Sequence, residues 1–123
     1  MNEKTVLIVD DEVAIRDMLE RMLEFAEYQT CTASSGSEGL QQFQDCEPDL
    51  VISDVLMPGM DGHEFCQRIR EVSDVPIMML SGQVNLEDEQ EKMRAQGLGI
   101  NAVMTKPLRM TEFLDTVENL LAR

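Results

Sequence analysis

The sequence predicts one α/β domain, residues 1–123, in which a parallel β-sheet is covered by helices on both faces. Five short apolar runs of the kind found in strands alternate with five segments whose apolar residues recur at helical spacing. The connections between these segments are short, and the right-handed crossover rule then favours parallel strands. Residues 50–52 are apolar throughout, which is typical of a strand buried on both faces.

Charge and hydropathy limit the partners of this domain. The net charge of −14 would repel a phosphate backbone, so we expect no direct nucleic-acid binding. No apolar run approaches the roughly 18 residues of a membrane helix and the N-terminus lacks a signal core, so we expect a cytoplasmic location and no membrane contact. Cys31, Cys46 and Cys66 are odd in number and widely spaced, which indicates reduced thiols serving as small core residues.

The first elements are recognised by a change in periodicity. Residues 5–9 are a β-rich apolar run, whereas residues 13–27 carry apolar side chains at helical spacing, with Asp11 or Glu12 in the N-cap position. Residues 28–33 have mixed polarity, as expected of a strand at a sheet edge.

The next two helices begin with capping boxes. Ser35-x-x-Glu38 stands at the start of the second helix, and Asp61-x-x-Glu64 at the start of the third. Residues 50–52 lie between these helices and belong to the third strand. This order of a helix, a strand and a helix continues the α/β alternation.

The last part of the chain completes the pattern. In the third helix we expect Val72 to face inward and His63 to be exposed. Residues 75–80 are a buried strand, residues 85–96 an acid-rich helix with a thin apolar stripe, and residues 100–105 the last strand. The final helix has a strong apolar stripe, formed by Phe113, Leu114, Val117, Leu120 and Leu121.

Reactive side chains stand at the expected carboxyl ends of four strands. They are Asp10 and Asp11 after the first strand, Asp54 after the third, Ser81 after the fourth and Lys106 after the fifth. Each acid taken alone is best explained as a solvated surface charge. Because ligands of parallel α/β sheets bind at the carboxyl ends of the strands, their joint placement indicates one site.

The chemistry of these residues suits phosphoryl transfer to an aspartate. Three carboxylates in one crevice repel each other unless a cation joins them, and a site of oxygen ligands suits Mg²⁺. Asp54 can act as the nucleophile and form an aspartyl phosphate. Mg²⁺, Lys106 and the Ser81 hydroxyl would each neutralise one oxygen of the transferred group.

Four motifs carry a resemblance to a known family, in matching order and spacing over nearly the whole chain. They are Val9-Asp10-Asp11-Glu12, Asp54-x-x-Met57-Pro58-x-Met60-Asp61-Gly62, Leu80-Ser81-Gly82 and Lys106-Pro107. With them the chain resembles the receiver domain of a bacterial two-component response regulator, similar to the single-domain chemotaxis type (CheY-like). The resemblance implies the flavodoxin-like (βα)5 fold with strand order 2-1-3-4-5.

The resemblance also implies a role for each site residue. Asp54 would be the phosphoacceptor, and Asp11, Asp10 and the Leu56 carbonyl would hold Mg²⁺ together with it. Lys106 would contact the phosphoryl group, and the peptide bond between Lys106 and Pro107 would be cis. Ser81 would be the switch hydroxyl that moves toward the phosphoryl oxygen.

The implied partners follow from this chemistry. A sensor histidine kinase or a histidine phosphotransfer protein would donate the phosphoryl group, and an unknown output protein would read the face formed by helix four, strand five and helix five. Homodimerisation through that face is a further option. The chain would assist its own phosphorylation and dephosphorylation without being an enzyme for a separate substrate. It ends at Arg123, directly after the last expected helix, which fits a single-domain protein or the receiver part of a longer regulator with a DNA-binding or enzymatic output domain.

The chain departs from the family pattern at places that include Val103, and two rival functions fit less well. Val103 stands where an aromatic switch residue is usual, so a phosphate sink or shuttle without direct output is an alternative. An aspartate-nucleophile phosphatase of the haloacid dehalogenase type would carry a second acid at Leu56. A flavodoxin-like FMN carrier would need a Ser/Thr/Gly-rich loop where this chain has Asp10-Asp11-Glu12.

Overall fold

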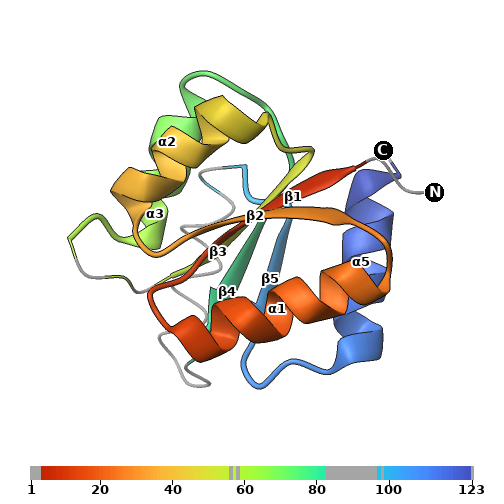
Figure 1. Cartoon of the computed structure of the whole chain (residues 1–123). Helices are drawn as coiled ribbons and strands as arrows, with labels where there is room; N and C mark the ends of the chain where they lie inside the picture. The colour runs from red at the N-terminus through yellow and green to blue at the C-terminus, as the bar shows by residue number, and fades with distance from the viewer. Residues whose placement is uncertain (1–3, 56, 58, 83–96, 98, 123) are drawn as a thin grey trace.

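The sheet has the predicted topology. The computed structural model describes residues 4–55, 57, 59–82, 97 and 99–122. Its five strands are all parallel and follow the order β2-β1-β3-β4-β5 (Figure 1). Their bounds are β1 Thr5–Val9, β2 Gln29–Ala33, β3 Leu50–Asp54, β4 Ile77–Ser81 and β5 Ala102–Thr105. β2 and β5 are the edge strands, and their side chains are less buried than those of the inner strands. For β2 this agrees with the mixed polarity of residues 28–33.

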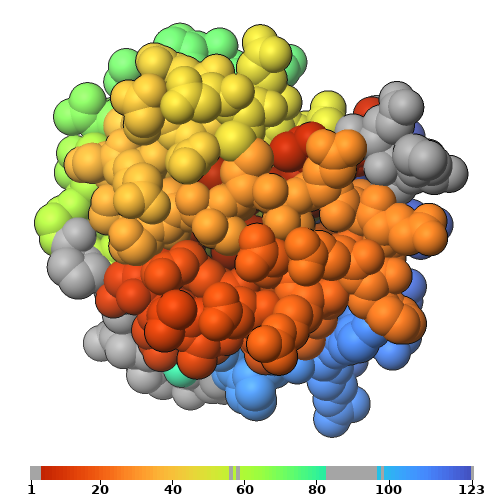
Figure 2. Space-filling view, in the orientation of Figure 1, coloured from red at the N-terminus to blue at the C-terminus, as the bar shows by residue number. Residues whose placement is uncertain are grey.

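Helices cover both faces of the sheet, as predicted. They are α1 Val13–Phe25, α2 Gly36–Cys46, α3 Gly62–Arg70 and α5 Met110–Leu121. The helix expected at residues 85–96 lies outside the described residues. In Figure 1 the edge strand β2 runs between α1 and α2, and Figure 2 shows the side chains of these two helices on the same face of the molecule. Within the described residues, no helix is long and apolar enough to cross a membrane.

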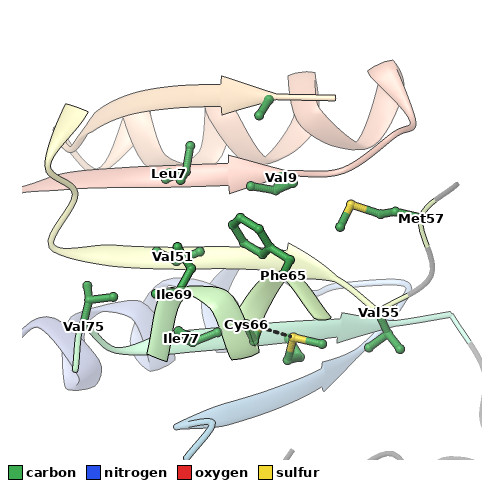
Figure 3. Packing of buried hydrophobic residues seen from close by; sticks show 12 residues of the cluster. Leu7, Val9, Val51, Val55, Met57, Phe65, Cys66, Ile69, Val75 and Ile77 are labelled. Carbon is green, nitrogen blue, oxygen red and sulfur yellow. Dashed lines mark hydrogen bonds between the residues drawn. The ribbon is translucent and has the colours of Figure 1, made fainter. Parts of the chain in front are cut away.

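Two apolar clusters hold the layers together. Under α2 and α3, Phe65, Cys66 and Ile69 pack against Leu7, Val51 and Ile77 of the sheet (Figure 3). Under α1 and α5, a second cluster packs against the opposite side of the same strands. The odd residues of β1 enter one cluster and the even residues the other, which is the two-residue period of a strand buried on both faces. The buried residues of the second cluster are Val6, Ile8, Leu19, Leu23, Leu50, Ile52, Met78, Leu80, Phe113, Val117 and Leu120.

Two of the three expected helix caps are confirmed. Ser35 Oγ accepts from the N–H of Glu38 at 3.2 Å, and Asp61 Oδ1 accepts from the N–H of Glu64 at 2.8 Å. The expectation for α1 is wrong in part, because Glu12 occupies the N-cap position but its side chain makes no capping hydrogen bond. Its carboxylate lies in the acidic cluster described below instead.

The cysteines correct the sequence interpretation. Cys31 of β2 and Cys46 at the end of α2 form a disulfide, whereas reduced thiols were expected. Their spacing of 15 residues matches no motif, and only the packing of α2 over the edge strand brings them together. Cys66 is buried and free, as expected. Burial raises the pKa of its thiol to about 12, so it is not a reactive nucleophile.

Two expectations for α3 are also wrong. Val72 is 74% exposed, because α3 ends at Arg70 and the helical periodicity no longer applies two residues later. His63 is only 7% exposed. The helix turn that carries it begins at Gly62, whose N–H donates to the Val55 carbonyl at 2.9 Å and brings the start of α3 against the end of β3.

Candidate functional site

The predicted site residues gather at one edge of the sheet. Asp54 is the last residue of β3 and lies opposite Leu80, while Ser81 ends β4 and lies opposite Thr105 of β5. Asp54 is 6% exposed and Ser81 is 3% exposed. The carboxyl ends of these strands therefore form the floor of a crevice, as the parallel topology requires.

A lysine joins the two buried carboxylates of this crevice. Lys106 Nζ lies 3.2 Å from Asp10 Oδ2 and 3.4 Å from Asp54 Oδ1. Asp10 is fully buried and 96 residues away in sequence, so the ion pair depends on the fold. The Lys106 N–H also donates to the Ser81 carbonyl at 2.7 Å, and the Lys106–Pro107 bond is cis, as the resemblance implied.

Four carboxylates converge beside the lysine. Each of Asp10, Asp11, Glu12 and Asp54 offers one oxygen, and these oxygens lie within 4.8 Å of one another. Two of the residues are buried and two are exposed, so the cluster opens to solvent on one side. An all-oxygen donor set with an open side fits Mg²⁺, which keeps several waters and takes few carboxylates.

The structure adds Glu12 to the predicted set and leaves one predicted ligand untested. Glu12 Oε1 lies 3.8 Å from Lys106 Nζ, although its side chain is 62% exposed. Its sequence signal was its place beside Asp10 and Asp11, which was interpreted as helix capping. Leu56, whose carbonyl was the fourth expected ligand, lies outside the described residues.

Hydrogen bonds from the main chain and from one side chain hold Asp10 in place. Its N–H donates to the Ala33 carbonyl at 3.1 Å, and its Oδ1 accepts from the N–H of Glu12 at 2.9 Å. Its carbonyl accepts from Arg16 Nη1 at 2.7 Å. Arg16 was not predicted as a site residue, since an arginine on an amphipathic helix has no distinctive spacing.

The loop after β3 comes into close contact with the start of α3. A Cβ added to Gly62 would meet the carbonyl oxygen of Asp54, lie 2.9 Å from the Val55 Cα and lie 3.0 Å from Met79 Cε. Only a residue without a side chain fits there, so Gly62 sets the distance between α3 and the phosphoacceptor candidate. In the sequence this glycine stands out only as the last residue of the second motif.

The electrostatics of the crevice favour a bound cation. Burial and the Asp10 carboxylate raise the pKa of Asp54 from 3.8 to about 6, although Lys106 acts to lower it. Burial acts to lower the pKa of Lys106, but Asp54 and Asp10 outweigh it and raise the pKa above its usual value. The single ammonium group of Lys106 stays charged but cannot neutralise all the carboxylates around it. The crevice therefore keeps an excess of negative charge that a bound cation would reduce.

Without metal, the stability of the chain should depend on the ionisation of Asp54. Its folded-state pKa is raised, so the stabilising contribution is complete below pH 3.8 and is lost as the pH rises through about 6. Asp54→Asn should therefore raise the free energy of unfolding at pH 7.5 by up to about 3 kcal/mol in EDTA. Urea denaturation of both proteins at pH 5 and at pH 7.5, on either side of the shifted pKa, measures it.

Asp115→Asn is the matched control for this prediction. Asp115 is an exposed aspartate of α5, and its replacement makes the same change in charge. A surface substitution of this kind changes the free energy of unfolding by less than about 0.5 kcal/mol. Equal behaviour of the two variants at pH 7.5 would contradict the raised pKa of Asp54.

Comparison with known proteins places the chain in one family. Residues 6–118 match the family model of the response regulator receiver domain, and the chain belongs to that family. It is therefore a receiver of two-component signalling. Receiver domains take phosphoryl groups from kinases or phosphotransfer proteins and generally bind Mg²⁺ at an acidic pocket, and this chain has the acidic cluster.

Individual relatives show the same likeness. The chain is 39% identical over 123 residues to a protein of Cyanophora paradoxa named "Probable transcriptional regulator ycf27", covering all of this chain and 50% of that protein. It is 37% identical over 124 residues to the alkaline phosphatase synthesis transcriptional regulatory protein PhoP of Bacillus subtilis, again covering all of this chain and 50% of that protein. The chain thus spans about half the length of these relatives. The chemotaxis protein CheY4 of Vibrio cholerae has a similar structure, with a TM-score of 0.87, 34% identity and coverage of 97% and 99% of the two chains.

Proposed function

We propose that Asp54 accepts a phosphoryl group from the phosphohistidine of a sensor kinase or phosphotransfer protein, with Mg²⁺ held by Asp10, Asp11 and Asp54. The observation that supports this most strongly is the position of Lys106, which lies within 3.4 Å of the buried Asp54 carboxylate and beside the acidic cluster. An aspartate, a cation site and a fixed ammonium in one crevice are the parts that phosphoryl transfer needs.

The residues of the chain divide the reaction between them. An Asp54 oxygen attacks phosphorus, the bond from phosphorus to the donor nitrogen breaks, and the donor imidazole leaves with the electron pair and takes up a proton. Lys106 neutralises one oxygen of the transferred group, and the Ser81 hydroxyl donates to another. Mg²⁺, when bound, supplies positive charge to a third oxygen. Water later cleaves the acyl phosphate and restores Asp54, so the chain is not an enzyme with a separate substrate.

Phosphoryl uptake by the purified chain tests this function. Incubation with a small acyl phosphate and Mg²⁺ should add one phosphoryl group per chain, measured by intact mass, and fragmentation should locate it on Asp54. EDTA should prevent the uptake, because the uncompensated carboxylates repel the anionic donor. Absence of labelling with Mg²⁺ present, or labelling at another residue, would refute the proposal.

Val103 favours a second candidate, a phosphate sink or shuttle without direct output. It lies in β5, opposite Met79, and packs partly buried against the apolar cluster under α2 and α3. A valine has no ring that could swing between an outward and an inward position, so an aromatic switch is absent at this place. The usual output face would then need another means of change.

An NMR titration with Mg²⁺ and beryllofluoride, a stand-in for the phosphoryl group, separates the two candidates. Both predict backbone amide shifts around Asp11, Asp54, Ser81 and Lys106. We expect the shifts to extend into β5 and α5, residues 102–121, because Lys106 directly follows β5. Shifts confined to the crevice would instead support the sink or shuttle.

The proposal extends to the partner that receives the signal. An output protein would read the face that includes β5 and α5, or a second copy of the chain would bind there. The similarity to transcriptional regulators twice as long supports a receiver that works beside an output domain of a longer protein.

A further inference from the structure

The carbonyl oxygen of Asp10 is held by a residue outside the acidic cluster. The parallel register of β1 ends at Val9, which lies opposite Ala33 of β2 and Ser53 of β3. Beyond that point the N–H of Asp10 still donates to the Ala33 carbonyl. The Asp10 carbonyl, in contrast, accepts from Arg16 Nη1 at 2.7 Å, and Arg16 comes from the first turn of α1.

This hydrogen bond restrains the peptide unit that joins Asp10 to Asp11. A peptide unit is planar, so an arginine that fixes the Asp10 carbonyl also fixes the Asp11 N–H and the Asp11 Cα, to which the Asp11 side chain is attached. The Asp10 carboxylate has its own restraints, the N–H of Glu12 and Lys106 Nζ. Arg16 therefore acts on the exposed part of the cluster, where Asp11 has less packing to hold it.

We propose that Arg16 is a positioning residue for the cation site, which holds the Asp10–Asp11 peptide so that the Asp11 carboxylate faces a divalent cation. The inference rests on the proposed function, since it takes the acidic cluster to be that cation site. A hydrogen bond from a charged guanidinium is roughly twice as strong as one between neutral groups, and its planar fork gives it a fixed direction.

Removal of Arg16 has two consequences of opposite sign. Arginine stays charged throughout the working pH range, so its loss makes the surroundings more negative and strengthens Mg²⁺ binding if charge alone matters. If Arg16 positions Asp11, its loss weakens binding. Among the described residues Arg16 makes no ion pair within 4 Å, so its charge acts on the cluster only at longer range, whereas its hydrogen bond is direct.

The test is the Mg²⁺ dissociation constant of the full chain, measured by NMR titration. Arg16→Met should bind Mg²⁺ on the order of 10-fold more weakly, the typical effect of losing a partner that orients a ligand. Arg16→Lys should recover most of the affinity, because an ammonium can donate to the same carbonyl. Arg21→Met is the matched control, an exposed arginine of the same helix with the same loss of charge, and should bind like the wild type or slightly more tightly.

A second measurement needs no metal. The amide shifts of Asp11 and Glu12 in EDTA should change in Arg16→Met and stay in place in Arg21→Met. If Arg16→Met does not fold, Arg16→Gln replaces it under the same criteria. Mg²⁺ affinity of the Arg16 variant equal to or tighter than that of Arg21→Met would overturn the inference while the proposed function stands. Failure of the wild type to bind Mg²⁺ more tightly than Asp11→Ala would overturn the proposed function, and this inference with it.

Discussion

Asp54→Asn is expected to take up no phosphoryl group under conditions in which the wild-type chain takes up one. The carboxylate is the nucleophile, and a carboxamide carries no full negative charge and cannot form an acyl phosphate. The substitution keeps the size and planar shape of a side chain that is 8% exposed, so the crevice can keep its form. Intact mass after incubation with a small acyl phosphate and Mg²⁺ measures the result.

The interpretation of that loss needs a stability control. Asp54→Asn should be at least as stable as the wild type in EDTA at pH 7.5, since it removes a carboxylate with a raised pKa. Lost labelling together with retained stability therefore identifies the nucleophile and excludes unfolding. Full labelling of Asp54→Asn would show that the phosphoacceptor is another residue of the chain.

Gly62→Ala is expected to lower the free energy of unfolding by about 3 kcal/mol, the upper part of the range for a side chain forced into a packed site. The new methyl group would collide with the carbonyl oxygen of Asp54 and press on the Val55 Cα. Met79 Cε, the third neighbour, ends a flexible side chain and can move, but the other two atoms are main chain. Relief of the collision must therefore displace Asp54 or α3.

Two measurements check this prediction, with Gly82→Ala as the control. Urea denaturation gives the stability, and the rate of phosphoryl uptake should fall because Asp54 no longer lies at the same distance from Lys106. A Cβ added to Gly82 meets no described atom within 4 Å, so the same chemical change there should leave the urea midpoint nearly unchanged. Equal midpoints for the two variants would show that the loop after β3 yields without cost.

Local pattern was enough for much of the fold. The odd and even residues of β1 enter opposite clusters, so an apolar run of five residues already identifies a strand covered on both faces. Ser35 and Asp61 cap their helices as predicted, because a capping box is a contact between residues three apart. Glu12 occupies its N-cap position without a capping hydrogen bond, and its carboxylate lies 3.8 Å from Lys106 Nζ instead.

Pairs that are distant in sequence could not be obtained in this way. Cys31 and Cys46 carry no motif, and they meet only because α2 packs over the edge strand. The prediction that Val72 faces inward was wrong, because a helix end cannot be placed to within two residues from periodicity. His63 is buried at the start of α3, where Gly62 is hydrogen-bonded to Val55 across the turn after β3, and this packing is not visible in the helical periodicity.

For the site, position along the chain was enough to predict that Asp10, Asp54 and Lys106 come together. Strand ends of a parallel sheet lie at one edge, so an acid or a lysine at each end is brought to one crevice whatever the details of packing. Only the packed structure fixes the distances and the supporting contacts. It places Lys106 within 3.4 Å of Asp54, lets Arg16 donate a hydrogen bond to the Asp10 carbonyl, and leaves no room for a side chain at Gly62. These depend on how α1 and α3 pack against the sheet, and packing is a sum of many small contacts that no short motif encodes.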